Sequence, residues 1–307
     1  MHVEPETSPA TPVGGSGPGE LIQPDRSPSP LSRMMHTYTG MMKRHPIVAG
    51  LVFIVTAAVL VESVWFGNLT GRVVYVAAMA CGVLLADFVI GRERVRPDPL
   101  PVRRPGPELS VALVCLLITE LLLMNAKQWH WHYDSPTFRL ANGISLVFFL
   151  LWQAPLLILF FAVMKYRLKD LGFRLYALLL PVLILLCFAA LASMSHTWVS
   201  TKWIWNEFGS VTNLIEVSLL AAFSEEFLRM TWQTRLSALL KNPATAWFLT
   251  AWIWSLVHFP NYGSLRSCLE IVPEGLMWGY VMFRTRSLLP TMILHLGNFM
   301  WAFKMLR

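Results

Sequence analysis

Two adjacent glutamates, Glu225 and Glu226, lie inside a long apolar run, NLIEVSLLAAFSEEFLRMTWQTRL. Two neighbouring carboxylates cannot both ionise cheaply in a low dielectric, so we expect one of them to be protonated or to have a cation partner. Arg229 follows Glu225 by four residues and Glu226 by three, and it can reach either carboxylate on one face of a helix. This pattern is typical both of a buried structural ion pair and of a carboxylate that takes part in chemistry.

Two histidines lie in later apolar runs. His258 comes four residues after Trp254, and His295 comes three residues before Asn298. A single histidine in an apolar helix is more often a hydrogen-bonded core residue than a catalytic one. Ionisable groups in three apolar segments each carry a cost of desolvation, however, and this favours a shared function. Together these residue types could hydrolyse an amide with water, because one group would remove a proton from water while others stabilise the oxyanion.

Two other chemistries use some of the same residues. Glu225, His258 and His295 could hold a zinc ion with one open coordination position, but the sequence contains no HExxH motif. Ser224 precedes the glutamate pair, but the GxSxG elbow of many serine hydrolases is missing. Both chemistries stay alternatives to hydrolysis by an activated water molecule.

The overall composition indicates a membrane protein that crosses the bilayer several times. The chain has 307 residues, of which 55% are hydrophobic and 14% charged, whereas soluble domains have about 25% charged residues. The net charge of +7 comes from short clusters of lysine and arginine between apolar runs. Such clusters are typical of cytoplasmic loops, so we do not expect nucleic acid as a partner. The partners that we expect are the lipid bilayer and a membrane-embedded or membrane-anchored protein substrate.

Nine apolar runs could form spanning helices, each of which needs about 20 apolar residues. They cover approximately residues 45–66, 73–91, 109–126, 143–164, 175–194, 211–238, 244–260, 268–283 and 287–305. The basic clusters all fall on one side of the membrane if the N-terminus is cytoplasmic. The sequence therefore predicts an all-α, polytopic transmembrane bundle of about nine helices, with the N-terminus inside and the C-terminus outside.

Three parts can be distinguished along the chain. Residues 1–40 are expected to be a disordered tail, because their first thirty residues are rich in proline, glycine and serine. Residues 41–168 are predicted to form transmembrane helices of unknown role, interrupted by the proline-rich linker 96–108. Residues 169–307 contain all of the candidate catalytic groups. No cleaved signal peptide is expected, so the first membrane helix would act as a signal anchor.

The motifs in this last part resemble those of the CPBP family of intramembrane glutamic proteases, which includes Rce1-type CAAX prenyl endopeptidases and bacterial Abi proteins. The family motifs EExxxR, FxxxH and HxxxN correspond here to EEFLR, WSLVH and HLGN, and the stretch EGLMWGYVMFRTRSLLPTMILH resembles the run that joins the last two. The resemblance covers about residues 169–300. In this chain Arg229 follows Glu226 by three residues and Asn298 follows His295 by three, whereas both spacings are four in the family motifs. Trp254 stands where the family usually has phenylalanine.

The resemblance implies a role for each candidate residue. Glu225 would be the general base for water, with His258 assisting it, and His295 and Asn298 would stabilise the oxyanion. Glu226 and Arg229 would orient the motif helix. The resemblance also implies hydrolysis without a metal ion, a cofactor or a covalent nucleophile. The function implied is that of an intramembrane endopeptidase acting near the C-terminus or the membrane anchor of a substrate, in the cytoplasmic membrane of a bacterium.

Two other functions fit parts of the pattern. A non-proteolytic binding or immunity membrane protein of the same fold would fit the shifted Arg and Asn spacings. A transporter could use the intramembrane glutamates and histidines as a proton relay, but we find none of the inverted repeats that are common in transporters.

Overall fold

The computed structural model describes residues 30–65, 69–92, 97–128, 149–194, 211–259 and 263–298. All regular secondary structure in these ranges is helical, as predicted for the fold class. The α-helices are α1 (Pro30–Arg44), α2 (Pro46–Trp65), α3 (Leu69–Arg92), α4 (Pro105–Gln128), α6 (Ala154–Ile158), α7 (Leu179–Met194), α9 (Val211–Leu240), α10 (Pro243–Leu256), α12 (Leu265–Thr285) and α13 (Leu288–Asn298). Single π-helical turns, η1 (Phe149–Gln153) and η2 (Leu159–Val163), flank α6, and η3 (Leu168–Leu171) is a 3-10 turn.

Three of the described helices are long and apolar enough to cross a membrane. These segments are Pro46–Trp65, Leu69–Gly91 and Pro105–Leu122, and shorter apolar helices cover Leu151–Val163, Leu179–Met194 and Leu288–Gly297. Large apolar side chains such as Phe53 and Ile54 are exposed on α2, as expected for a surface in contact with lipid. The chain is therefore an integral membrane protein built from helices. The count of nine spanning helices and the orientation in the membrane stay predictions.

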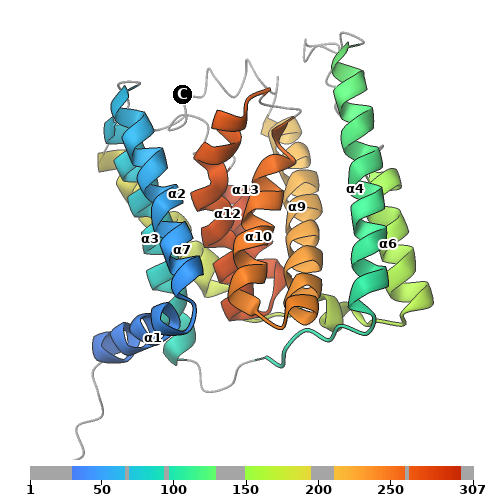
Figure 1. Ribbon diagram of the computed structural model, residues 1–307, viewed down its shortest axis with the longest axis horizontal. Coiled ribbons are helices and arrows are strands. Elements are labelled where there is room, and N and C mark those ends of the chain that lie inside the picture. Colours follow the sequence, from blue (N-terminus) through green and yellow to red (C-terminus); the bar gives the residue numbers. More distant parts are fainter. Residues whose placement is uncertain are drawn as a thin grey trace, which may run out of the picture.

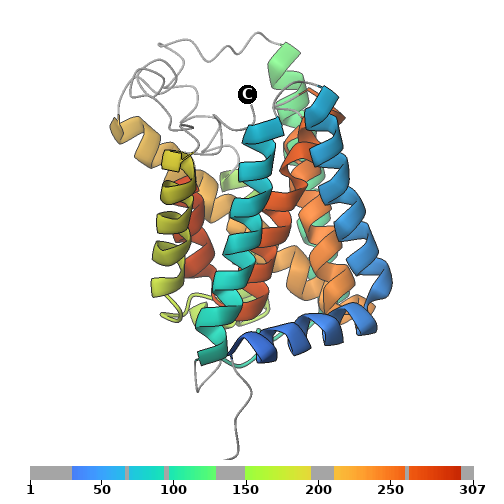
Figure 2. The ribbon, with the colours of Figure 1, turned by 90° about the vertical axis from the view of Figure 1, so that its left-hand side faces the viewer.

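The first helix, α1, corrects the predicted disordered tail of residues 1–40. The chain is helical from Pro30 onward, because the proline-rich composition ends there and LSRMMHTYTGMMKR follows with helical periodicity. Residues 1–29 lie outside the described residues. At His45 the chain turns into α2, and α1 runs across the lower end of the bundle (Figures 1 and 2).

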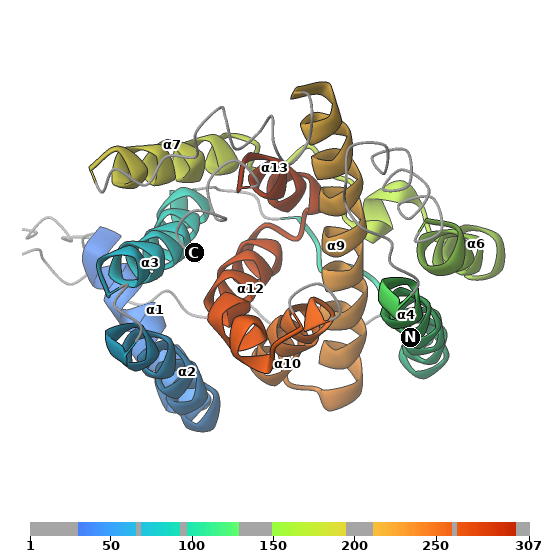
Figure 3. The same cartoon turned by 90° about the horizontal axis from the view of Figure 1, so that it is seen from above.

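Helix α12 lies at the centre of the bundle. Seen from above, it is surrounded by α2 and α3 on one side and by α9, α10 and α13 on the other (Figure 3). Every residue from Glu270 to Met282 is buried. The sequence predicts a shorter span here, 268–283, because hydropathy detects only apolar residues and the first turn of the helix includes polar ones. The helix starts earlier, since the Ser264 side chain accepts a hydrogen bond from the backbone N–H of Ser267 (3.5 Å).

Two glycines allow α12 to approach its neighbours closely. A Cβ atom at Gly275 would lie 2.8 Å from Cε3 of Trp254 and 3.1 Å from the carbonyl oxygen of Ala251. A Cβ atom at Gly279 would lie 2.9 Å from Cδ1 of Trp247. Small residues four positions apart are typical of tight helix packing in membranes. They bring α10 against α12 and so set the position of Trp254.

The turn between α12 and α13 is attached to a loop that precedes α7. The backbone N–H of Leu288 donates to the carbonyl oxygen of Gly172 (2.6 Å), and the Ser287 hydroxyl donates to that of Arg174 (2.6 Å). Gly172 has a φ of 84°, a left-handed conformation that glycine adopts at little cost. These contacts hold the start of α13, and α13 carries His295.

Buried ion pairs join the N-terminal helices to the C-terminal ones. Arg235 of α9 donates to Glu108 of α4 (2.8 Å), and neither side chain is exposed. Arg72 of α3 contacts Glu270 of α12 (2.7 Å). Asp87 of α3 contacts Arg284 of α12 (3.0 Å). The N-terminal helices therefore pack as part of the same bundle.

Candidate active site

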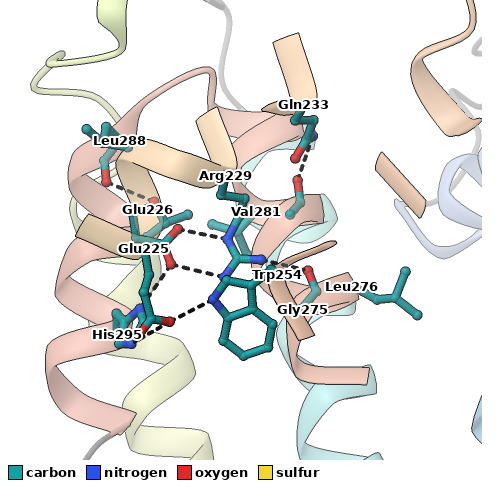
Figure 4. Close-up of polar contacts among 12 residues, drawn as sticks. Glu225, Glu226, Arg229, Gln233, Trp254, Gly275, Leu276, Val281, Leu288 and His295 are labelled. Atoms are coloured by element: carbon teal, nitrogen blue, oxygen red, sulfur yellow. Dashed lines mark hydrogen bonds and ion pairs between the residues drawn. The ribbon is translucent and has the colours of Figure 1, made fainter. Parts of the chain in front are cut away.

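Three helices supply the candidate catalytic side chains. Helix α9 provides Glu225, Glu226 and Arg229, the residue His258 follows the end of α10, and α13 provides His295. Figure 4 shows the glutamates and His295 pointing toward one another from different helices, with Trp254 of α10 beside them. The structure thus brings together five of the six residues identified in the sequence.

Glu226 is a buried member of an ion pair. Its carboxylate accepts two hydrogen bonds from Arg229, with Nε at 3.1 Å and Nη2 at 3.3 Å, and both side chains have no exposed area. The spacing alone left Glu225 and Glu226 as alternative partners for Arg229, and the structure assigns the arginine to Glu226. A fork-shaped pair of this kind compensates the buried charge and fixes the direction of the carboxylate.

Arg229 also connects α9 to α12 and α10. Its Nη1 donates to the carbonyl oxygen of Gly275 (3.2 Å). Its guanidinium carbon lies 4.6 Å from the ring centre of Trp254 and 5.6 Å from that of Trp278. Contacts of a guanidinium with aromatic faces are favourable where water is excluded. Arg229 is therefore a structural junction of the three helices.

Glu225 has a different environment, although it is directly adjacent to Glu226 in the chain. One oxygen, Oε2, accepts a hydrogen bond from Nε1 of Trp254 (2.7 Å). The same oxygen lies 3.6 Å from Nε2 of His258 and 3.6 Å from Nε2 of His295. The side chain is 18% exposed, whereas Glu226 is fully buried. The two adjacent carboxylates are thus divided between an accessible position and a structural one.

Both histidines are oriented through their Nδ1 atoms. Nδ1 of His258 lies 2.8 Å from the carbonyl oxygen of Trp254, and Nδ1 of His295 lies 3.0 Å from Oε1 of Glu226. A carbonyl or carboxylate oxygen can only accept, so each Nδ1 carries the proton and donates. Nε2 accepts a hydrogen bond in a neutral ring and donates one in a protonated ring, and both Nε2 atoms face Glu225.

The comparisons with known proteins bear on this site. No curated protein and no solved structure matches the chain. One family model does, described as type II CAAX prenyl endopeptidase Rce1-like. Residues 207–300 match this Rce1-like model. The match confirms the resemblance to the CPBP family for the part of the chain that contains the site.

The Rce1-like segment contains every candidate catalytic residue and the helices α9, α10, α12 and α13. Asn298 is the last residue of α13, and its side chain lies outside the described residues. Its predicted position beside His295 therefore stays a prediction. The helices before residue 207 lie outside the match.

Two residues near the site were given no role from the sequence. Trp254 was identified only as the aromatic position of the second motif, and in the structure its indole N–H donates to Glu225. Glu274 of α12 is 5% exposed and interacts electrostatically with His295 and Glu225. A glutamate at the start of EGLMWGY, in a run that is otherwise apolar, was the available signal for this third carboxyl group.

The zinc alternative concerns Glu225, His258 and His295. Within the described ranges, no three histidine, cysteine, aspartate or glutamate side chains are arranged to hold a metal ion.

Proposed function

We propose that this protein is an intramembrane endopeptidase that uses a glutamate-activated water molecule. The observation that supports it best is the position of Oε2 of Glu225, at 3.6 Å from Nε2 of both His258 and His295. These separations are longer than a direct hydrogen bond, and a water molecule can bridge polar atoms at such distances. The match to an endopeptidase family over residues 207–300 agrees with this proposal.

In the proposed reaction, Glu225 takes a proton from water as the water oxygen attacks the carbonyl carbon of the scissile peptide bond. His258 assists by accepting a hydrogen bond from the same water through Nε2. The carbonyl oxygen gains negative charge as its π bond breaks. When the C–N bond breaks, Glu225 returns the proton to the leaving amine, so the enzyme ends in its starting state.

His295 would stabilise the oxyanion in its protonated form. Its Nδ1–H donates to Glu226, and this contact fixes the direction of the ring, as the buried aspartate does in Ser-His-Asp triads. The Nε2–H of the imidazolium would then donate to the oxyanion. Asn298 would be a second donor, in line with the family resemblance.

The substrate that we propose is a membrane-embedded or membrane-anchored protein, cut near its C-terminus or its anchor. Glu225 is the fifteenth residue of the 30-residue helix α9, about 20 Å from either end. A carboxylate at this depth suits a peptide bond that lies within the bilayer. We place the protein in the cytoplasmic membrane of a bacterium, as the resemblance to bacterial Abi proteins implies.

The test is a comparison of membrane-protein C-termini in cells that carry the wild type or Glu225→Gln. Glu120→Gln is a matched control, because it makes the same change in another intramembrane glutamate, on α4. We expect a set of C-termini that stays uncut with Glu225→Gln and is cut normally with Glu120→Gln at equal expression. Identical C-termini in all three strains would contradict the proposal and support the non-proteolytic binding or immunity function.

A further inference from the structure

Helix α1 combines three faces that a membrane-surface helix needs. Tyr38 and Met41, three residues apart, face the bundle: the Tyr38 hydroxyl donates to Oδ2 of Asp87 (2.5 Å), and Met41 packs against the apolar cluster that contains Tyr75 and Trp278. This face attaches α1 to α3. It also links α1 to α12, because Tyr280 of α12 donates to the same Asp87 oxygen (2.7 Å).

The next face round the helix is apolar and exposed. Met35 and Met42 are seven residues apart and so lie on one side of α1, with 56% and 59% of their areas exposed. Each is three or four residues from Tyr38, so the exposed methionines are directly beside the face that packs on the bundle. An apolar strip beside spanning helices is in a position to enter the outer part of the hydrocarbon layer.

The third face is basic. His36 and Lys43, also seven residues apart, are exposed, and so is Arg44. The sequence of α1 contains no carboxylate. None of the ion pairs among the described residues includes Lys43 or Arg44. The positive charge of this face is thus not compensated by the described part of the protein.

The direction of α1 completes the arrangement. Figures 1 and 2 show it at the end of the bundle, lying across the direction of α2 and α3. Since α2 and α3 are candidate spanning helices, α1 lies along the membrane surface. Its methionines can then reach acyl chains while Lys43 and Arg44 stay at the level of the lipid headgroups.

We propose that α1 is a surface helix that binds the anionic headgroups of membrane phospholipids through Lys43 and Arg44, with Met35 and Met42 inserted among the acyl chains. Charge complementarity favours anionic over zwitterionic lipid. Each cation near an anionic surface contributes about a fivefold change in affinity, so the two together contribute about 30-fold at low salt. This proposal does not depend on the proposed protease activity.

The experiment measures which lipids gather beside α1 in the full-length chain. A fluorophore is attached at Thr39→Cys, between the apolar and basic faces, in a chain whose four native cysteines are replaced by alanine. The protein is placed in nanodiscs of equal parts phosphatidylcholine and phosphatidylglycerol, in which one or the other lipid carries a quencher. We expect phosphatidylglycerol to quench more strongly, and the preference to weaken when salt is raised.

Two double variants then test the residues. Lys43→Gln with Arg44→Gln should remove the preference, so that both lipids quench equally. Lys165→Gln with Lys169→Gln removes the same charge from exposed positions in and near the 3-10 turn η3, and it should leave the preference unchanged. Equal quenching by both lipids in the unmodified chain, or a preference that persists without Lys43 and Arg44, would overturn the proposal. Quenching by neither lipid would show that α1 is away from the membrane and would also overturn it.

Discussion

At the scale of single residues, Arg229 is the group on which the site depends most. It donates two hydrogen bonds to Glu226 and one to Gly275 of α12, and it lies over the ring of Trp254. Glu226 in turn orients His295. Loss of one arginine would therefore leave a buried carboxylate without its cation and would release contacts on three helices.

We predict that Arg229→Met lowers the free energy of unfolding by about 3–5 kcal/mol, since removing one member of a buried ion pair leaves the other uncompensated. Thermal unfolding of the detergent-purified protein measures this. The double variant Glu226→Gln with Arg229→Met removes both charges and should recover most of the loss. Equal destabilisation by the single and double variants would show that the ion pair is not what Arg229 contributes.

Trp254 gives a second prediction at this scale. Trp254→Phe keeps an aromatic ring beside Arg229 and His258 but removes the N–H that donates to Glu225. A hydrogen bond to a charged group contributes about 1.5–3 kcal/mol, so we expect Glu225 to lose its orientation and kcat to fall by about tenfold or more. The KM should change little, because no contact of Trp254 with substrate is needed for this effect. A changed KM with unchanged kcat would contradict the assignment.

The sequence predicted most of the site because ionisable groups are costly inside a membrane. Glu225, His258 and His295 stand out from apolar surroundings, and helical spacing limits the partners of Arg229 to two. Whether Arg229 pairs with Glu225 or with Glu226 depends on how α12 and α13 pack, since His295 on α13 also donates a hydrogen bond to Glu226. Such information from other helices is not contained in the local pattern. The hydrogen bond from Trp254 to Glu225 was not predicted for the same reason, because it joins α10 to α9.

At the scale of elements, the glycines of α12 set the distance between the helices that carry the site. We predict that Gly275→Ala costs about 1–3 kcal/mol, because its Cβ would meet the rigid ring of Trp254 and the backbone of Ala251. Gly50→Ala, in α2, is the matched control, since nothing lies within 4 Å of the added atom. That variant should be neutral or slightly stabilising because alanine favours helix over glycine. Equal effects of the two substitutions on thermal unfolding would contradict the close approach at Gly275.

The buried contact between α4 and α9 is part of a larger polar cluster. Tyr166 donates to Oε1 of Glu108 (2.8 Å) and accepts from the backbone N–H of Arg103 (2.6 Å). Burial raises the pKa of the Tyr166 phenol above its ordinary value, so the hydroxyl keeps its proton and remains a donor. Together with Arg235, this cluster fixes the end of α9 on α4 and thereby the register of the helix that carries the glutamate pair.

Hydropathy located the apolar helices well but not their ends. The predicted span 211–238 matches α9, whereas the start of α12 depends on the capping side chain of Ser264. The π-helical turns on either side of α6 could not be predicted, because their residues are as apolar as those of a regular helix. Helix α1 was missed because its composition was averaged with that of the proline-rich segment before it.

At the scale of the whole molecule, the N-terminal helices complete the core. Glu270 and Arg284 of α12 have their partners, Arg72 and Asp87, on α3. Residues 97–307 expressed alone would therefore expose a face of α12 on which Arg284 has lost its partner and Glu270 keeps only Arg266 of the same helix (3.4 Å). We predict that this fragment aggregates in size-exclusion chromatography, and that co-expression with residues 1–96 yields a monodisperse complex of the two pieces. A monodisperse, stable fragment 97–307 without its partner would contradict this role of α2 and α3.

The central claim is that Glu225 activates water for peptide hydrolysis, and the most direct test is the cleavage rate of the purified chain in proteoliposomes. The substrate is one whose C-terminus depends on Glu225 in cells. A general base contributes about 100-fold or more, so Glu225→Gln should lower kcat by at least that factor with little change in KM, while Glu120→Gln keeps the wild-type rate. A folded Glu225→Gln protein that cleaves at the wild-type rate would contradict the account.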